Sequence, residues 1–193
     1  MNNYDLTTPL FFPGRNYLLE SLHPKVGETI CEIGCGTARN LIKLNHINQN
    51  ANLVGLDASA EMVKIAKSKV KKTGLEKKIV LYNGLAENFE FEEQIDTFLF
   101  IYSLSMISKP NEALICTFNQ LPPGGKIHIL DFGNFKFWPI IGDFIKGFLN
   151  VFKIKPNKDI LEKTFELNKE SKLEIKNKMG GYNYSAIIQR GNF

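Results

Sequence analysis

Apolar and polar positions follow a regular alternation of two patterns over the first two thirds of the chain. Short unbroken apolar runs, typical of buried strands, are followed by stretches whose apolar side chains recur three and four positions apart, as in amphipathic helices. In one of these stretches Met62, Val63, Ala66 and Val70 share a single helical stripe. The predicted strands are 29–33, 53–56, 78–82, 97–102 and 126–130, and the predicted helices are 16–23, 40–48, 60–72 and 111–121. This alternation predicts βαβ units and a parallel sheet that is buried on both faces.

The last third of the chain departs from that alternation. Residues 135–170 have a helical pattern, and two strand candidates follow at 172–178 and 182–190. Met179, Gly180 and Gly181 separate these strands, and a short glycine turn of this kind favours an antiparallel hairpin. The sequence therefore predicts an α/β, Rossmann-like fold with a mostly parallel seven-stranded sheet, a C-terminal antiparallel strand and helices on both faces.

Length and composition indicate one globular domain that spans residues 1–193. A chain of 193 residues has the length of a single domain, and its 44% hydrophobic content excludes intrinsic disorder. The uncharged stretch 97–108 is too short for the roughly 20 apolar residues of a membrane span. The first 15 residues lack the basic start and apolar run of a secretion signal, so we expect a cytoplasmic location.

Charge and cysteine content exclude several classes of function. The net charge is +4, but only Arg15, Arg39 and Arg190 among the 24 basic residues are arginines, the usual readers of bases and phosphates. The lysines of segment 64–78 are more typical of a solvated helix face than of a patch for an anionic partner. The three cysteines have no zinc-type spacing. We therefore expect neither nucleic acid, nor disulfide, nor metal.

The most specific motif is the segment Glu28–Asn40, in which a strand ends at Gly34-Cys35-Gly36 and a helix follows. Such a turn lets a ligand approach the backbone and meet the amides of the helix N-terminus. The third glycine of a dinucleotide-binding loop would fall at Arg39, so that pattern is not matched. Glu32, two positions before the first glycine, suits a positively charged ligand such as S-adenosylmethionine. Asp57 ends the second strand, where a carboxylate can accept hydrogen bonds from both ribose hydroxyls.

Together these motifs resemble the class I S-adenosylmethionine-dependent methyltransferases over residues 28–132. The resemblance implies that Glu32 and the glycine loop hold the methionine end of the cofactor and that Asp57 holds its ribose. Segment 83–87 matches the motif at the adenine edge, but Leu85 stands where the family commonly has an aspartate. The cofactor-binding set that the resemblance implies is Glu32, Gly34, Cys35, Gly36, Asn40, Asp57, Ala58, Met62, Leu85, Ala86, Glu87 and Ile101.

Substrate class is read from the segments outside the cofactor motifs. Segment 100–105 lacks the Asn/Asp-Pro-Pro-aromatic tetrad of enzymes that methylate nucleobase amines. Segments 4–15, 102–107 and 128–133, with the Phe-rich stretch after them, resemble bacterial betaine-lipid N-methyltransferases, relatives of the phosphatidylethanolamine enzymes. The resemblance implies N-methylation of an amine headgroup. Other readings are N- or O-methylation of a soluble metabolite, aminocarboxypropyl transfer, and a binding module without turnover.

We assign roles within this hypothesis as follows. Aromatic faces accommodate a quaternary ammonium, which favours Tyr4 and Tyr102 as catalytic residues and Tyr182 and Tyr184 as substrate contacts. Asp131, at the end of the fifth strand, is a candidate proton acceptor. Arg15 can meet a carboxylate or phosphate of the substrate.

Four segments follow from these assignments. They are an N-terminal lid or substrate segment (1–27), the cofactor-binding core (28–134), a helical insertion (135–170) and a C-terminal hairpin (171–193). Residues 139–152 carry an apolar stripe at helical spacing. A helix with such a stripe can lie on an anionic membrane or pack on the sheet, and the spacing is the same in both cases. The oligomeric state stays open.

Overall fold

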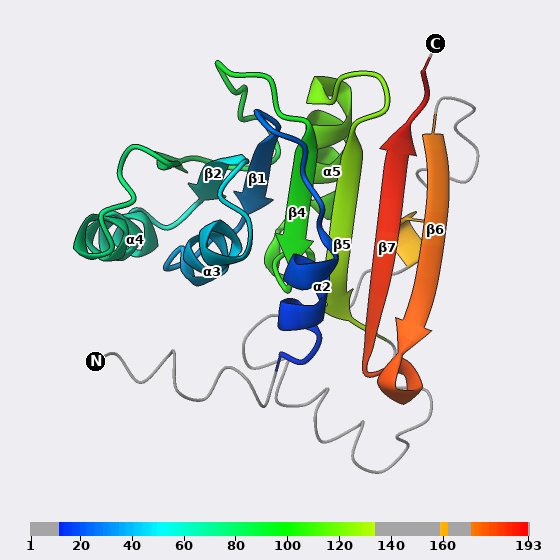
Figure 1. The fold of residues 1–193 in the computed structure, drawn as a ribbon. Helices are drawn as coiled ribbons and strands as arrows, with labels where there is room; N and C mark the ends of the chain where they lie inside the picture. The colour runs from blue at the N-terminus through cyan, green and yellow to red at the C-terminus, as the bar shows by residue number, and fades with distance from the viewer. Residues whose placement is uncertain (1–11, 134–158, 162–170, 193) are drawn as a thin grey trace.

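The computed structural model describes residues 12–133, 159–161 and 171–192 (Figure 1). The stretch 139–152 lies outside them, as does most of the predicted insertion. The described elements are α2 (Arg15–Ser21), β1 (Thr29–Ile33), α3 (Arg39–Ile47), β2 (Asn52–Asp57), α4 (Ala60–Lys72), β3 (Ile79–Asn83), β4 (Thr97–Ile101), η1 (Leu104–Met106), α5 (Pro110–Gln120), β5 (Lys126–Phe132), β6 (Ser171–Lys178), η2 (Met179–Gly181) and β7 (Asn183–Arg190).

The seven strands form one sheet in the order β3-β2-β1-β4-β5-β7-β6. Strands β1 to β5 pair in parallel, whereas β7 pairs antiparallel with both β5 and β6. The predicted fold class and the predicted hairpin are confirmed. Strand β5 extends two residues beyond its predicted end, because its ladder with β7 continues to the pair Phe132 and Asn183.

Helices cover both faces of the sheet, and each face has its own core. Helices α2, α3 and α4 pack on one face over side chains such as Leu19, Leu44 and Val63. Helix α5 covers the other face with Leu114 and Phe118. Every residue of β1 is buried, which agrees with the unbroken apolar runs from which the parallel strands are predicted.

Helix α4 shows why the local sequence folds as predicted. Ser59 caps it by accepting a hydrogen bond from the Met62 amide at 3.3 Å. Glu61 lies in the first turn, while lysines occupy the last turn, where the helix dipole favours positive charge. The stripe of Val63, Ala66 and Val70 is buried, as its period predicts.

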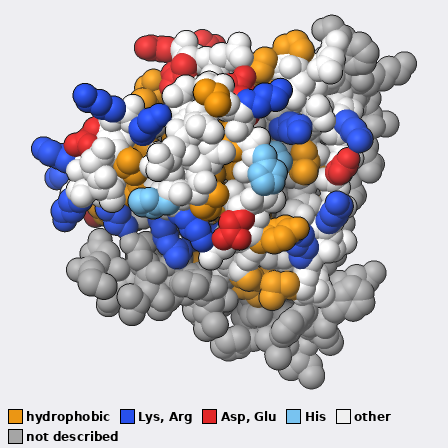
Figure 2. All heavy atoms as spheres, viewed as in Figure 1, with side chains coloured by type: hydrophobic (Ala, Val, Ile, Leu, Met, Phe, Trp, Pro, Cys, Tyr) orange, Lys and Arg blue, Asp and Glu red, His pale blue; other side chains and the backbone are white. Residues whose placement is uncertain are grey.

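Charged side chains lie over the solvent side of these elements, and lysines gather beside α4 at the left edge of Figure 2. Lys64, Lys67, Lys71 and Lys72 are exposed, which agrees with a solvated helix face. Within the described ranges, no helix is both long and apolar enough to cross a membrane.

Candidate cofactor and substrate site

The glycine loop follows β1 at the carboxyl edge of the parallel strands. Gly34 has a φ of +72°, and a Cβ added there would lie 2.6 Å from the Ser103 Cβ. The amides of Gly34 and Cys35 both donate to the Leu56 carbonyl, at 2.8 and 3.1 Å. Gly36 also has a positive φ, +53°, but a Cβ there would meet no atom within 4 Å. The loop is therefore packed against protein at Gly34 and open on the side of Gly36.

Asp57 links the loop to the end of β2. One carboxylate oxygen accepts the Gly36 amide at 2.7 Å and the other accepts the Ser59 amide at 2.9 Å. The side chain is half-buried, and each carboxylate oxygen can accept a second hydrogen bond. Asp57 can thus orient the loop and still receive ribose hydroxyls.

Glu32 is the buried carboxyl group of the site. It is 1% exposed, and the Asn40 side-chain amide donates to its Oε1 at 2.6 Å. Its Oε2 is buried without a hydrogen-bond partner. Burial raises the pKa of this carboxyl to about 8, opposed by the Asn40 hydrogen bond and the Arg15 charge. A buried carboxylate oxygen without a partner fits a ligand that brings its own positive, hydrogen-bonding group.

The other predicted cofactor residues differ in how their side chains are placed. Ala58 and Leu85 are exposed, and Met62 and Glu87 are half-buried. Cys35, Ala86 and Ile101 are buried in the cores.

Arg15 and Tyr102 join the N-terminal segment to the end of β4. The Tyr102 hydroxyl donates to the Pro13 carbonyl at 2.6 Å and accepts the Asn183 side-chain amide at 2.8 Å. The guanidinium carbon of Arg15 lies 4.3 Å from the Phe12 ring centroid and 5.4 Å from that of Tyr102. The Tyr102 side chain therefore ties the N-terminal segment to the end of β4. Burial raises the pKa of its hydroxyl above the ordinary value.

Asp131 does not have the environment of the proton acceptor that we predict from sequence. It is 1% exposed, its Oδ2 accepts the Ser105 amide at 2.9 Å, and its Oδ1 accepts the Ser105 hydroxyl and the Phe132 amide, both at 2.7 Å. Burial raises the pKa of this carboxyl to about 6, against the effect of these hydrogen bonds. Both oxygens accept hydrogen bonds from the protein, and through Ser105 they hold the turn after β4; the role of Asp131 as a proton acceptor stays a prediction.

Tyr184 also differs from its predicted role as a substrate contact. Its side chain is fully buried in the core beneath α5, opposite Asp131 in the β5–β7 ladder. Tyr182 is half-buried, and its ring centroid lies 6.1 Å from that of Phe132. Tyr4 lies outside the described residues, so its catalytic role stays a prediction.

Three contributors to the site are missed by the sequence analysis. The ring centroid of Phe12 lies 5.1 Å from that of Tyr102. The Asn183 side-chain amide also donates to the Pro13 carbonyl, at 3.1 Å. The Ser103 hydroxyl donates to the Ile33 carbonyl at 2.6 Å, which secures the start of the glycine loop. No local motif marks these contacts, since each joins segments far apart in the chain.

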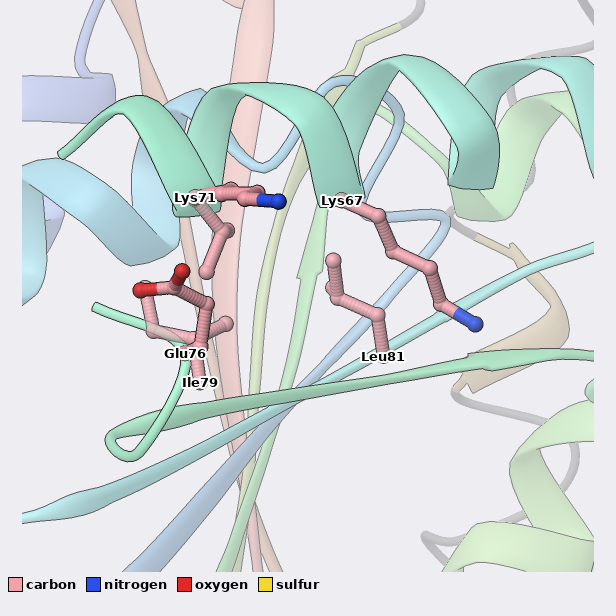
Figure 3. A pocket seen from close by; sticks show the side chains of 6 residues that line it. Lys67, Lys71, Glu76, Ile79 and Leu81 are labelled. Carbon is pink, nitrogen blue, oxygen red and sulfur yellow. The ribbon is translucent and has the colours of Figure 1, made fainter. Parts of the chain in front are cut away.

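A cavity of about 320 Å³ lies elsewhere, between α4 and β3 (Figure 3). Its lining combines the apolar side chains of Val70, Ile79 and Leu81 with Lys67, Lys71 and Glu76. None of the predicted site residues lines it.

Comparison with known proteins identifies the family. A model described as "Methyltransferase domain" matches residues 24–183, most of the chain. The chain belongs to this methyltransferase-domain family. The matched range includes the glycine loop, Asp57 and the Tyr102 segment, whereas Phe12, Pro13 and Arg15 precede it.

Individual relatives add detail. Demethylmenaquinone methyltransferase of Lactobacillus johnsonii is 28% identical over 145 residues, covering 74% of this chain and 58% of that protein. Carboxy-S-adenosyl-L-methionine synthase of Campylobacter jejuni is 38% identical over 93 residues, covering 48% of this chain and 38% of that protein. The chain thus spans less than two thirds of the length of either relative.

A solved structure agrees with the fold. The plantazolicin methyltransferase BpumL, in complex with SAH, superposes with a TM-score of 0.71 at 16% identity, covering 97% of this chain and 86% of BpumL. Family and fold together support S-adenosylmethionine as the cofactor, as the glycine loop, Glu32 and Asp57 predict.

Proposed function

We propose that the protein is an S-adenosylmethionine-dependent methyltransferase. The observation that carries this proposal is the buried Glu32 Oε2, which has no partner beside a glycine loop that is open at Gly36. A cofactor with an ammonium group supplies the missing donor. Asp57, held by the Gly36 and Ser59 amides, is placed to receive the ribose.

When bound, S-adenosylmethionine supplies an activated methyl group, so the protein's task is to position and desolvate the nucleophile. Tyr102 and Phe12 hold the N-terminal segment over the end of β4. Asp131 holds the turn at Ser105. We propose that the substrate lies beside these contacts.

Calorimetric titration with S-adenosylhomocysteine tests cofactor binding. We expect saturable binding to the wild-type protein and a strong loss in Glu32→Ala, with exposed Glu61→Ala as the control. A wild-type protein that binds neither S-adenosylhomocysteine nor S-adenosylmethionine would overturn the proposal. Retained binding in a protein that never transfers a methyl group would favour the binding-module reading.

For the substrate, we propose the amine headgroup of a lipid, on the sequence resemblance described above. The half-buried rings of Phe12 and Tyr182, which pack on the buried rings of Tyr102 and Phe132, support an amine that gains positive charge. Arg15 already lies over two of these rings, so such an amine would have to approach another ring face. Peripheral membrane contact on the cytoplasmic side belongs to this proposal.

A second substrate class is the ring of a quinol-type lipid. One observation favours it: several relatives are named demethylmenaquinone or ubiquinone/menaquinone C-methyltransferases. Methylation of a ring carbon needs an electron-rich ring, which deprotonation of a phenol provides.

Mass spectrometry of lipids from cells that express the protein separates these classes. Headgroup masses that rise in methyl steps would support the amine proposal. One added methyl on a quinone would replace it with the second class, and a methylated soluble amine with unchanged lipids would contradict both. Flotation with anionic vesicles tests membrane contact, which fails if the protein stays in the aqueous fraction.

A further inference from the structure

The guanidinium of Arg15 lies over the rings of Phe12 and Tyr102, directly after the end of β4. Arg15 is the first residue of α2, and its Nε is buried without a hydrogen-bond partner. Stacking on Phe12 and Tyr102 satisfies the faces of the group but not this N–H. Arg15 thus has a donor available in the region where Glu32 has an acceptor available.

Strand pairing places Arg15 in the same region as Glu32, because Arg15 lies over the ring of Tyr102, directly after β4, and Glu32 pairs with Leu99 of that strand. Burial lowers the Arg15 pKa, the Glu32 charge opposes that effect, and the Arg39 charge adds to it. Arg15 and Glu32 nevertheless form no ion pair within 4.0 Å in the described part of the chain. An unpaired guanidinium and an unpaired carboxyl in one region can receive a ligand that carries both signs, because the ligand's ammonium favours the carboxylate form of Glu32.

The start of α3 adds to the positive side of this region. Ala38 precedes the helix with a φ of +59° and provides no side-chain cap, and Arg39 is the first helical residue. A helix start without a side-chain cap leaves amide donors for an anion. The like charges of Arg15 and Arg39 would also be relieved by an anionic group between them.

We propose that Arg15 binds the carboxylate of the cofactor's amino-acid end while Glu32 binds its ammonium. This inference rests on the proposed function and changes the role of Arg15, which the sequence analysis assigns to the substrate. The N-terminal segment then becomes part of the cofactor site, because Phe12 and the Tyr102 bond to Pro13 fix where the guanidinium lies.

Two ligands that differ only at the amino-acid end test the proposal. S-adenosylhomocysteine carries the ammonium and carboxylate, whereas 5′-methylthioadenosine keeps the adenine, ribose and sulfur without them. By calorimetry, we expect Arg15→Gln to weaken S-adenosylhomocysteine about ten- to hundredfold, the effect of a lost hydrogen bond to a charged group, and to leave 5′-methylthioadenosine unchanged. Arg15→Lys should recover part of the loss. Exposed Lys64→Gln, which removes the same charge from α4, should alter neither.

Three outcomes would overturn the proposal: unchanged S-adenosylhomocysteine binding in Arg15→Gln, an equal loss for both ligands, or a loss confined to substrate turnover. If Arg15→Gln does not fold, the wild-type protein can be titrated with the analogue of S-adenosylhomocysteine that lacks only the carboxylate. Full retention of affinity for that analogue would likewise contradict the role. A wild-type protein that binds none of these ligands would instead contradict the proposed function.

Discussion

The Asn40 side-chain amide donates to Glu32 Oε1 at 2.6 Å, while Glu32 Oε2, in the same buried carboxyl group, has no partner. One oxygen is thus fixed by the first turn of α3 and the other is presented to the site. Burial raises the pKa of this group to about 8, so near neutral pH the carboxyl is largely protonated in the free protein.

Cofactor binding should therefore release a proton. An ammonium beside Glu32 favours the carboxylate and lowers its pKa, so a carboxyl that is protonated at pH 7 loses its proton on binding. Calorimetric titration of S-adenosylhomocysteine in buffers with different ionisation enthalpies measures this release. We expect a buffer-dependent enthalpy in the wild-type protein and none in Glu32→Gln; the same dependence in both would contradict the assignment.

The same raised pKa affects folding stability. Between the ordinary carboxyl pKa and about 8, the folded protein holds a proton that the unfolded chain has lost, so stability contributed by this group falls as pH rises through that window. Glu32→Gln removes the effect. We expect urea midpoints of wild type and variant to diverge as the pH is raised from 5 to about 8. Parallel profiles would contradict the raised pKa.

Gly34 and Gly36 should respond differently to alanine. At Gly34 a Cβ would lie 2.6 Å from the Ser103 Cβ, so Gly34→Ala should lower stability substantially. At Gly36 the space is open, and Gly36→Ala should cost only about 1 to 2 kcal/mol for its positive φ while blocking close approach of the cofactor. Thermal unfolding and S-adenosylhomocysteine titration measure the two effects. Normal binding by Gly36→Ala would contradict the placement of the ligand.

Asp57→Ala should weaken S-adenosylhomocysteine binding by about 1 to 3 kcal/mol, because ribose hydroxyls and the Gly36 amide lose their acceptor. Glu61→Ala, which removes an exposed carboxylate four residues away, is the control for charge. A similar loss of S-adenosylhomocysteine affinity in both variants would show that Asp57 acts only through the overall negative charge at this edge of the sheet.

Tyr102→Phe should lower the free energy of unfolding by about 1 kcal/mol, because the hydroxyl donates to Pro13 and accepts from Asn183. The N-terminal segment loses its tether, so we also expect weaker S-adenosylhomocysteine binding. Tyr17→Phe, at an exposed tyrosine of α2, is the matched control. Unchanged urea midpoints in Tyr102→Phe would contradict the tether.

Leu85→Asp tests the departure from the adenine-edge motif. Leu85 is 52% exposed, so the substitution should leave folding intact. An aspartate there adds an acceptor for the adenine amino group, and we expect tighter 5′-methylthioadenosine binding. No gain in affinity would show that the adenine edge does not face this position.

Local sequence determines much of this protein. The boundaries of the strand over 29–33 and the helix over 60–72 agree with the structure, because period and capping are properties of neighbouring residues. The candidate site of the glycine loop, Glu32 and Asp57 is also predicted from spacing, since one strand–turn–helix unit and the end of the next strand contain these residues.

Only the tertiary structure decides the roles that depend on distant contacts. Asp131 and Tyr184 have the residue types of a site, yet the hydrogen bonds from Ser105 and the core beneath α5 occupy them. The sequence predicts Arg15 as a substrate contact but does not show what surrounds its guanidinium. Its place follows from Phe12, Tyr102 and Asn183, which the parallel sheet and the antiparallel β7 bring to one edge. The raised pKa of Glu32 also depends on tertiary structure, because the side chain is buried only when these segments pack together.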